Sequence, residues 1–493
     1  MSEPDISGSK AWLWQRASLC PTAPALFFDG AEIGLGELAE RAGDLAGRLR
    51  ALGVGPGDRV ALLLDPCVRL VELIHGLQFL GAGALLLNTR LTRTELSRQL
   101  NRTRPTLLVH GREHTATVTE PGMQVDGLKA VEAVAELDAV SAGKWQAQAG
   151  DGSIGPGAVH SILFTSGSTE EPKAVMLTND NHFASALASR ANLGRIDEDK
   201  WLNLLPLYHV GGLSILLRSV IDGVPVLLQE RFDAAEANRA IFEDGVTLLS
   251  LVPTMLEKML AQCPRPHYPP SLRAVLVGGA ALDKKLLMRA QRARMPVLAS
   301  YGLTEAASQV ATVPPAVDGV PEDSVGRPLA GVELAIDGAD AHGKGEIMIR
   351  GANVMAGYLD EPRRGRGGAA TWFKTGDIGR IDEHGFLYLH GRKGELIISG
   401  GENVSPMEVE AALLAHPLVA EAAVYPVDDD TWGQTVACAL VVCAGGKLGE
   451  SDIDQSCRRR LAGYKVPRRV RFVDALPRTP LGKLDRSALK KIG

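Results

Sequence analysis

The sequence predicts an α/β protein in three parts: a large N-terminal domain of layered α/β sheets, a small β-rich subdomain, and a small α+β C-terminal domain. Apolar strands alternate with helices through the first part, which is typical of a parallel sheet covered on both faces. Short strands separated by Gly and Asp turns follow from about residue 320, and a new α+β pattern begins near Gly394. We therefore expect domains at 1–393 and 394–493, with the β-rich subdomain at about 320–390.

The alternation is clearest between residues 35 and 87. Leu38, Ala42, Leu45 and Leu49 recur at helical spacing and predict a helix over 35–52, followed by a Gly-rich break and a buried strand over 60–64. A second helix is expected at 68–80 and a second strand at 84–87. Further helices are expected at 181–191, 212–221, 234–243 and 254–261, and further strands at 201–205, 225–228, 248–252, 273–277 and 296–299.

The later part of the chain predicts shorter elements. Strands are expected at 332–336, 345–350 and 386–389 in the β-rich subdomain. The C-terminal part predicts helices at 406–414 and 452–461 and strands at 419–427, 435–442 and 468–473.

Composition narrows the class of protein. With 45% hydrophobic and 23% charged residues, the chain is typical of a globular protein with a large core. The net charge of −5 gives no reason to expect nucleic acid as a partner. No apolar run approaches the ~20 residues of a membrane span, and the acidic start of the chain lacks the order of a signal peptide. Six scattered cysteines fit reduced thiols, so we expect a cytoplasmic protein.

A loop rich in hydroxyl groups is the first candidate for function. Thr165-Ser166-Gly167-Ser168-Thr169 lies between two apolar runs that predict strands, and Pro172-Lys173 follows. Backbone N–H groups, hydroxyls and the Lys173 ammonium suit an anion, above all a polyphosphate. The Walker A pattern does not fit this loop. The alternative is an ordinary Ser/Thr-rich surface loop.

Three other motifs follow predicted strands or turns. The turn formed by residues 278–280 stands at the carboxyl end of the strand at 273–277, where open α/β sheets bind ligands. Tyr301 to Glu305 offers an aromatic ring, a hydroxyl and a carboxylate, which suit a base, a phosphate and Mg²⁺; the alternative is ordinary helix capping. Asp377, in Thr375-Gly376-Asp377, offers a carboxylate on a turn for two ribose hydroxyls, although turn aspartates are usually structural.

Three weaker motifs complete the set. His209 follows a strand and precedes Gly211-Gly212, whose glycines allow backbone to approach a ligand; a lone histidine here is more often a capping or core residue. The segments 399–403 and 479–483 are glycine-broken loops in the C-terminal part.

Together and in this order, these motifs resemble the adenylate-forming superfamily of acyl- and aryl-CoA synthetases, peptide-synthetase adenylation domains and luciferases. The resemblance extends from about residue 13 to 489 and includes Gly391-Arg392, Gly400-Gly401-Glu402-Asn403 and Gly482-Lys483. The segments 205–219, 250–256 and 301–309 are most similar to the o-succinylbenzoate-CoA ligases of menaquinone biosynthesis. The resemblance implies a carboxylic acid, ATP, Mg²⁺ and coenzyme A as ligands, and a mobile C-terminal domain.

The resemblance also assigns roles to individual residues. The implied phosphate-binding residues are Thr165, Ser166, Gly167, Ser168, Thr169 and Lys173, with Thr304 on the α-phosphate and Glu305 on Mg²⁺. The implied nucleoside-binding residues are Tyr301, Gly302, Gly279, Ala280 and Ala281 at adenine and Asp377 and Arg392 at ribose. Lys483 is implied to bridge the carboxylate and α-phosphate, Gly400 and Gly401 to reach the CoA channel after rotation at Gly394, and His209 to gate the acyl pocket.

Two positions depart from the superfamily pattern. Glu170 stands where the phosphate loop usually has glycine, and a carboxylate beside a polyphosphate is repulsive by roughly 1 to 4 kcal/mol at ~4 Å. Gly394 stands at a hinge position that is commonly Asp, Lys or Ser, and glycine permits the φ/ψ change that a hinge needs.

The second carboxylate of o-succinylbenzoate requires a cation or hydrogen-bond donors inside the pocket. Arg218, Ser308 and Gln309 are the candidates. The alternative for Arg218 is a helix-surface arginine paired with Asp222 four residues on.

Other functions stay open at this stage. The chain also fits another aryl or medium-chain acid CoA ligase, a stand-alone adenylation enzyme or, less well, a non-catalytic nucleotide-binding scaffold. The sequence leaves a homo-oligomer as open as a monomer.

Overall fold

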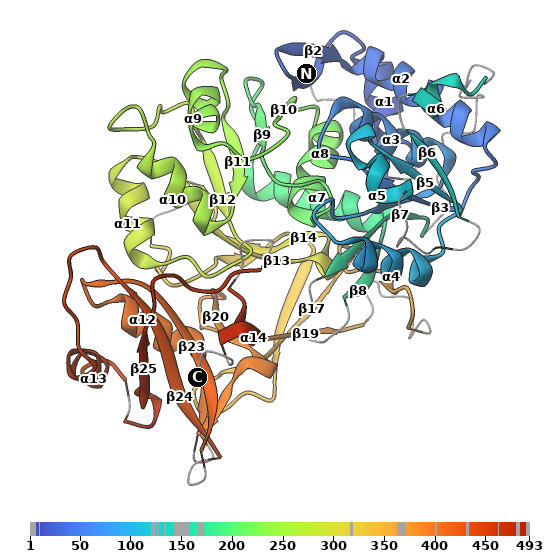
Figure 1. The fold of residues 1–493 in the computed structure, drawn as a ribbon. Coiled ribbons are helices and arrows are strands. Elements are labelled where there is room, and N and C mark those ends of the chain that lie inside the picture. The colour runs from blue at the N-terminus through green and yellow to red at the C-terminus, as the bar shows by residue number, and fades with distance from the viewer. Residues whose placement is uncertain are drawn as a thin grey trace.

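The computed structural model describes residues 6–8, 10–119, 125, 128–132, 135–141, 155, 157–165, 172–315, 319–361, 371–399, 402–429, 433–461, 463–479 and 484–489. They form a large body of sheets and helices, coloured blue to yellow in Figure 1, and a smaller C-terminal unit, coloured orange to red, at one end of it.

One sheet of the body is mainly parallel. Its strands are β3 (Arg59–Leu63), β4 (Gly83–Leu86), β5 (Leu107–His110), β6 (Lys129–Glu132), β7 (Val159–Thr165), β8 (Lys173–Thr178) and β18 (Gly357–Tyr358). Within the described residues their order is β18-β8-β7-β4-β3-β5-β6. β3 to β7 run parallel, whereas β7 and β8 pair antiparallel because the connection between them is too short for a crossover.

A second, larger sheet lies beside the first. Its strands are β1 (Pro24–Phe28), β2 (Ala31–Gly34), β9 (Trp201–Asn203), β10 (Val226–Leu228), β11 (Leu248–Leu251), β12 (Ala274–Val277), β13 (Val297–Leu303), β14 (Ser308–Thr312) and β15 (Arg327–Pro328). They lie in the order β15-β14-β13-β12-β11-β9-β10-β1-β2 across the part of the chain that is described. The central strands are parallel, and the two edges are antiparallel.

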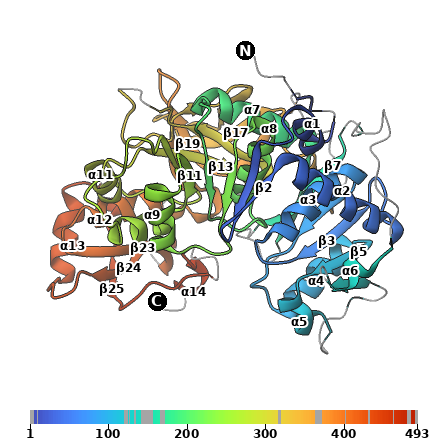
Figure 2. The same ribbon diagram turned by 90° about the horizontal axis from the view of Figure 1, so that it is seen from above.

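Helices cover both sheets (Figure 2). The α-helices of the body are α1 (Trp12–Leu19), α2 (Leu35–Ala51), α3 (Val68–Leu80), α4 (Arg93–Thr103), α5 (Thr115–Thr119), α6 (Ala135–Ala139), α7 (Asn179–Leu193), α8 (Val210–Asp222), α9 (Ala234–Glu243), α10 (Pro253–Ala261) and α11 (Lys284–Arg292). Two short 3₁₀ helices, η1 (Arg112–His114) and η2 (Thr304–Ala306), occupy turns after strands β5 and β13. Capping boxes built on Thr92 and Thr178 fix the starts of α4 and α7.

The two sheets share one core. Residues of β3 and β4 belong to the same buried cluster as residues of β10 and β12, together with α3 and α8. Helix α3 is buried from Leu70 to Leu80, as expected for a helix that is apolar on all sides. The opposite face of the larger sheet packs against α9, α10 and α11, and that of the smaller sheet against α4. The layers therefore run helix, sheet, helix, sheet, helix.

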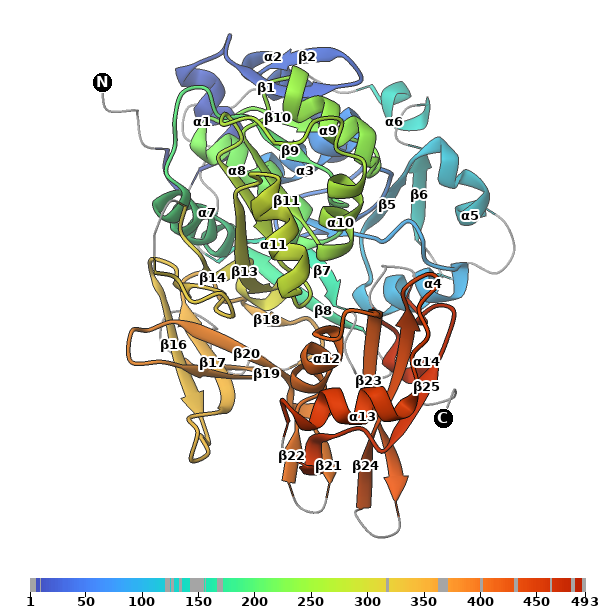
Figure 3. The same cartoon turned by 90° about the vertical axis from the view of Figure 1, so that its left-hand side faces the viewer.

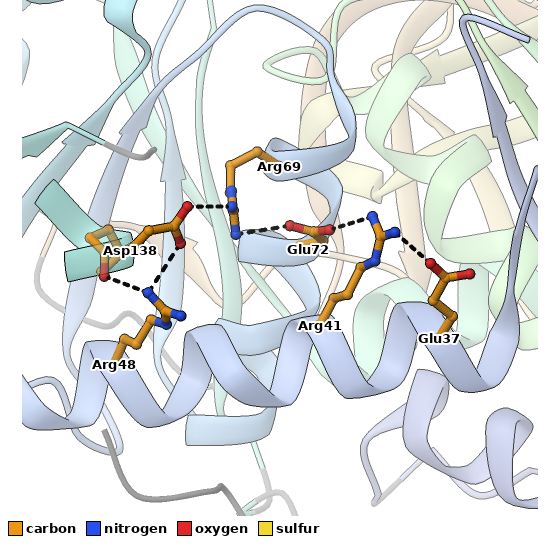
Figure 4. Close-up of polar contacts among 7 residues, drawn as sticks. Glu37, Arg41, Arg48, Arg69, Glu72 and Asp138 are labelled. Carbon is orange, nitrogen blue, oxygen red and sulfur yellow. Dashed lines mark hydrogen bonds and ion pairs between the residues drawn. The ribbon is translucent and has the colours of Figure 1, made fainter. Parts of the chain in front are cut away.

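Ion pairs tie three helices of the N-terminal part together (Figure 4). The Glu72 carboxylate on α3 forms ion pairs with Arg41 of α2 at 3.5 Å and with Arg69 of α3 at 3.1 Å. Arg69 also reaches Asp138 of α6 at 2.9 Å, and Asp138 accepts from Arg48 of α2 at 3.2 Å. Burial raises the pKa of the Glu72 carboxyl although both arginines lower it. The network links α2, α3 and α6 at the edge of the shared core.

The β-rich part and the C-terminal unit form two further sheets (Figure 3). The first contains β16 (Val332–Asp337), β17 (Gly345–Gly351), β19 (Phe373–Ile381) and β20 (Leu387–Arg392), all antiparallel. The second contains β21 (Ile397–Ser399), β22 (Glu402–Val404), β23 (Val419–Asp429), β24 (Gly433–Val442) and β25 (Arg469–Phe472). Its helices are α12 (Pro406–Leu414), α13 (Glu450–Arg458), α14 (Arg486–Leu489) and the 3₁₀ turns η3 (Lys393–Glu395) and η4 (Gly463–Lys465).

The structure confirms the predicted α/β class and most predicted elements to within a few residues. Three expectations were wrong or incomplete. The sheets of the body are mixed, because β8 runs antiparallel to β7 and β14 runs antiparallel to β13. Asp377 is not on a turn but inside β19, where Gly376 has φ +75° and the pairing with neighbouring strands shifts. The strand at 296–299 extends to Leu303, which places Tyr301 in the sheet. Among the described residues, no helix has the length and apolarity to cross a bilayer.

Three histidines are buried in the shared core and predict acid sensitivity. His75 (α3), His160 (β7) and His182 (α7) are buried, and the His160 and His182 rings lie 5.0 Å apart. Burial lowers the pKa of His75 to about 4 and of His182 to about 3, and holds that of His160 well below its usual value. These imidazoles are neutral in the folded protein, whereas the unfolded chain binds their protons below a pKa of about 6.5.

The free energy of unfolding is therefore expected to be highest above about pH 6.5 and to fall as the pH drops towards 4. His75 and His182 each contribute a loss of about 2 kcal/mol at pH 5, and His160 adds a loss in the same direction. Urea unfolding at pH 7.5, 6 and 5 measures this, and His75→Leu should reduce the pH slope by about one proton. The exposed His267, changed to Gln, is the control. A wild-type slope equal to that of His75→Leu would contradict this account.

Candidate functional site

The carboxyl ends of the parallel strands bring several predicted residues together. Strands β12 and β13 are neighbours with Val277 opposite Ala299, so the turn at Gly279 lies near Tyr301. Gly279 has φ +78°, and Ala280 and Ala281 after it are exposed. The turn and the Tyr301 segment thus form one side of a site at this edge of the larger sheet.

Tyr301 and two residues of the β-rich sheet form a hydrogen-bonded group. The Tyr301 hydroxyl donates to Asp377 Oδ2 at 2.7 Å, and Arg392 Nε donates to Asp377 Oδ1 at 2.8 Å. Asp377 and Arg392 are directly opposite on β19 and β20, which explains how residues 15 apart meet. Each carboxylate oxygen keeps a lone pair for another donor, so the group can still accept two hydroxyls.

The hairpin from β13 to β14 is unusually tight at its turn. A Cβ atom on Gly302 would lie 2.1 Å from the Ser308 carbonyl oxygen, so only glycine fits there. Ala307 and Ser308 have φ +52° and +115°, values that non-glycine residues rarely adopt. This backbone places Thr304 and Glu305 on η2 at the same edge.

Tyr358 on β18 connects the two sheets at the site, and the sequence reasoning missed it. Its hydroxyl donates to Glu305 Oε1 at 2.9 Å, and Lys173 Nζ lies 4.4 Å from the centre of its ring. Lys173 also forms an ion pair with Glu361 at 3.5 Å. It is the first residue of β8 and stands opposite Thr165, the last residue of β7, which precedes the hydroxyl loop. One tyrosine therefore holds a lysine and a carboxylate that come from different sheets. A lone Tyr after a Gly carries no sequence signal of this role.

The Glu305 carboxylate suits a hard cation. It is partly exposed and held by Tyr358, and a carboxylate fixed in this way is a typical ligand of Mg²⁺. Several predicted site residues lie outside the described residues: Ser166, Gly167, Ser168, Thr169, Gly400, Gly401 and Lys483. Glu170 lies outside them as well.

A second group of predicted residues lies along helix α8. His209 precedes the helix, and its ring packs edge-on against Tyr208 with centroids 4.7 Å apart. A Cβ atom on Gly212 would lie 2.5 Å from the carbonyl oxygens of residues 205 and 206, so glycine lets the helix start close to the segment that follows β9. His209 therefore stands at the start of α8, beside Tyr208.

Arg218 lies two turns further along α8 and contacts two serines. Its Nη2 donates to Ser214 Oγ at 3.0 Å and to Ser308 Oγ at 3.3 Å, and Ser214 Oγ donates to Ser308 Oγ at 3.2 Å. The sequence reasoning named Arg218 and Ser308 but missed Ser214, which stands one helical turn before Arg218. Gln309 is buried and donates to Thr312 at 3.0 Å, so its amide nitrogen is directed to that side chain.

The environment of Arg218 excludes the alternative of a helix-surface arginine. The side chain is only 3% exposed, so it is not a helix-surface arginine. Its guanidinium carbon lies 5.6 Å from the centre of the Trp201 ring, and Asp222 pairs instead with Arg190 at 3.7 Å. Burial lowers the pKa of Arg218 to about 10, which leaves it protonated at neutral pH. A buried, charged guanidinium with two hydroxyl partners is suited to a carboxylate.

Polar interactions are among the contacts between the described residues of the C-terminal unit and the body. Lys285 Nζ of α11 donates to the His416 carbonyl at 3.0 Å, and Lys344 lies 4.0 Å from Glu408. Gly394 is exposed in η3, and a Cβ atom there would meet no neighbour within 4 Å. Beside it, Lys393 pairs with Glu346 at 2.7 Å.

Two family models match the chain. The model of the AMP-binding enzymes matches residues 13–359, and that of the AMP-binding enzyme C-terminal domain matches residues 408–483.

Individual proteins match nearly the whole chain. The 2-succinylbenzoate–CoA ligase of Geobacillus kaustophilus is 42% identical over 98% of this chain and 97% of its own. The solved structure of o-succinylbenzoate CoA synthetase from Bacillus subtilis in complex with the acyl-adenylate intermediate is 35% identical, with a TM-score of 0.88 and 98% of each chain covered. The same enzyme in complex with ATP and magnesium ion also gives a TM-score of 0.88, with 98% of this chain and 99% of that chain covered.

The contact between Tyr358 and Glu305 leads to a prediction about MgATP. Tyr358→Phe removes the hydroxyl that fixes the carboxylate while keeping the ring under Lys173. A hydrogen bond to a charged group is worth about 1.5–3 kcal/mol, so we expect the apparent KM for MgATP to rise roughly tenfold or more. ATP–pyrophosphate exchange at varied MgATP measures this.

Tyr388→Phe is the matched control, because Tyr388 donates to Asp382 at 2.8 Å in the β-rich sheet. Equal effects of the two substitutions, or no effect of Tyr358→Phe, would contradict a role for Tyr358 in holding Glu305.

Proposed function

Because the chain belongs to the AMP-binding enzyme family, we propose that it is an ATP-dependent acid–CoA ligase whose substrate is 2-succinylbenzoate. The observation that carries the choice of acid is the buried Arg218 guanidinium with Ser214 and Ser308 at its Nη2, deep along the helix that begins after His209. An acid with one carboxylate has no need of such a cation, whereas a dicarboxylate leaves its second carboxylate to be neutralised. The names of the close relatives support the same substrate.

The first step joins the acid to AMP. A substrate carboxylate oxygen attacks the α-phosphorus of ATP, and pyrophosphate leaves from the opposite side. The groups that we assign to the nucleotide are Thr165, Lys173, Thr304, Tyr301, Asp377 and Arg392, together with the hydroxyl loop at 166–169. These groups position ATP and neutralise the charge of its phosphates, as in other phosphoryl transfers. Glu305 would hold Mg²⁺, which supplies positive charge to the phosphates.

The second step forms the thioester. The sulfur of CoA attacks the acyl carbon, and AMP leaves with the electron pair of the broken C–O bond. We assign the exchange of steps to rotation of residues 394–493 about Gly394, whose exposed position and open surroundings suit a hinge. Lys483 serves the first step and Gly400 with Gly401 the second, while His209 closes the acyl pocket.

The dicarboxylate assignment predicts a selective effect of Arg218→Met, which removes the charge and keeps an apolar side chain of similar length. We expect kcat/KM for 2-succinylbenzoate to fall about 10- to 100-fold relative to kcat/KM for benzoate, because one charged hydrogen-bonding partner is lost. AMP release with ATP, CoA and each acid measures this.

Arg239→Met, on the exposed face of α9, is the control. The panel also includes a medium-chain fatty acid, and a wild-type preference for benzoate or that acid would favour the other CoA ligases. Equal losses for both aromatic acids would remove Arg218 from substrate selection.

The proposed rotation about Gly394 predicts that Lys483→Ala abolishes ATP–pyrophosphate exchange but keeps thioester formation from pre-made acyl-adenylate. Its ammonium is needed only where the carboxylate meets the α-phosphate. Stopped assays of each half-reaction separate the steps. Loss of both half-reactions would contradict the rotation, and absence of exchange in the wild type with every acid would refute the proposed function.

A further inference from the structure

Three side chains that can ligate a metal ion gather at the carboxyl edge of the smaller sheet. Asp65 follows β3 by two residues, and Glu113 and His114 lie in η1, the turn that follows β5. Strands β3 and β5 are parallel neighbours with Leu63 opposite His110, so both segments leave the sheet at the same point (Figure 2). These three residues have no part in the groups that we assign to the nucleotide or to the acid.

The position is one at which open α/β sheets bind ligands. The strand order β7-β4-β3-β5-β6 takes the chain from β3 to β4 on one side and from β5 to β6 on the other. By the general rule for such sheets, ligands bind at the carboxyl ends of two neighbouring strands whose connections diverge in this way. Strands β4 and β3 separate this point from the hydroxyl loop after β7.

The ligand atoms of the three side chains lie close enough to share one ion. One nitrogen or oxygen atom from each residue lies within 4.8 Å of the other two. His114 Nε2 is 3.7 Å from Asp65 Oδ2 and 3.7 Å from Glu113 Oε1. Two ligands at about 2.1 Å from Zn²⁺ in tetrahedral geometry are about 3.4 Å apart. Both separations from His114 are therefore close to those around a bound ion.

The His114 ring nitrogen is not satisfied by its neighbours. A separation of 3.7 Å is too long for a hydrogen bond. His114 Nε2 is buried and has no hydrogen-bond partner among the described residues, and the side chain is only 12% exposed. A buried polar atom without a partner is costly. The imidazole therefore points towards two carboxylates that it does not reach, and an ion between them would satisfy it.

The two carboxylates also favour a cation. Their ligand oxygens lie within 4.8 Å of each other, so their negative charges repel. His114, Thr89 and Arg90 lower the pKa of the Asp65 carboxyl, which is therefore ionised at neutral pH. Arg90 places one positive charge near the two negative ones, and a divalent cation between the carboxylates would supply the rest. The Asp65 backbone N–H, which donates to Glu113 Oε1 at 3.4 Å, holds the second carboxylate at this place.

We propose that Asp65, Glu113 and His114 bind a divalent transition-metal ion of the Zn²⁺ class. Zinc accepts a histidine nitrogen together with carboxylate oxygens, whereas Mg²⁺ and Ca²⁺ prefer oxygen ligands alone. Three protein ligands leave a position for water. The ion joins the ends of β3 and β5 and fixes the short segment from Asp65 to the start of α3, the helix that packs against both sheets. This role is structural and does not rest on the proposed function.

The alternative is a protonated His114 that forms ion pairs with the two carboxylates. The two interpretations differ in how they depend on pH. Zinc requires a neutral imidazole and ionised carboxylates, so its binding weakens as the pH falls. An ion pair made by the imidazole strengthens as the pH falls, because imidazole groups ordinarily gain their charge below about pH 6.5.

Zinc titration of the full chain tests the site. The protein is first freed of metal with a chelator, and excess Mg²⁺ is present in every sample so that Glu305 is occupied. At pH 7.5 we expect the wild type to bind one Zn²⁺ per chain more than His114→Gln, measured by competition with a zinc-indicator dye. Saturating Zn²⁺ should raise Tm by about 2 to 4 °C. The Kd should rise about fourfold at pH 6, because less of the imidazole is neutral.

Variants locate the ion. Asp65→Asn, Glu113→Gln and His114→Gln each remove a ligand, and each should raise the Kd for zinc at least tenfold. Gly111→Ala is a sharper test, because it keeps all three ligands. Gly111 has φ −72°, which alanine adopts readily, but a Cβ atom there would overlap Glu113 Oε1 and push the carboxylate aside. The Kd should therefore rise as it does in Glu113→Gln.

His384→Gln is the matched control. His384 Nε2 also lies 3.7 Å from the carboxylate of the preceding residue, Glu383, but the two side chains are 68% and 86% exposed. They belong to no group of three ligands in the described part of the chain. This variant should bind zinc as the wild type does.

Four results would overturn the site: equal zinc binding by the wild type and His114→Gln, an equal loss in His384→Gln, an unchanged Kd in Gly111→Ala, or tighter binding at pH 6. Binding of Ca²⁺ with the affinity of Zn²⁺ would overturn the class of ion. Absence of ligase activity would refute the proposed function but would not alter any of the zinc measurements.

Discussion

The arrangement of the site depends on one packing constraint: two sheets share a single layer of buried helices. Because α3 and α8 pack against both sheets, neither sheet can shift without opening the core. Their carboxyl edges are therefore fixed relative to each other. This fixed arrangement allows Tyr358, on an edge strand of the smaller sheet, to donate to the Glu305 carboxylate at the edge of the larger sheet. The β-rich sheet adds Asp377 and Arg392 to the same edge through Tyr301.

Local patterns in the sequence predicted the elements of this core well. The apolar runs of β3, β4 and β12 and the amphipathic repeat of α2 carry their own signals, because burial on both faces or on one face leaves a period in the chain. The turn at 278–280 was also placed at the carboxyl edge, as the rule for parallel sheets requires, and the motif at Tyr301 to Glu305 was placed after the strand that follows. The resemblance to a known superfamily assigned the separate motifs to their ligands.

Other features had no local signal. Tyr358 and Ser214 act through partners 53 and 94 residues away, and nothing in their neighbours marks them. Asp377 was placed on a turn because Gly376 beside it suggests one, whereas the glycine creates an irregularity inside a strand. The burial of Arg218 could not be read from a helix whose other residues are mostly apolar, since an arginine in such a helix fits either a covered or an exposed face. These are consequences of tertiary contact, which only coordinates supply.

The contacts between the C-terminal unit and the body have a consequence for how the molecule responds to its medium. Lys285 and Lys344 reach across with ammonium groups near the surface, where dissolved salt screens charges. The Debye length is about 8 Å at 0.15 M salt and about 3 Å at 1 M, so attraction of this kind weakens as electrolyte is added. An apolar seam would behave in the opposite way. If residues 394–493 rotate as we propose, the balance between the two arrangements of the C-terminal unit would therefore depend on ionic strength.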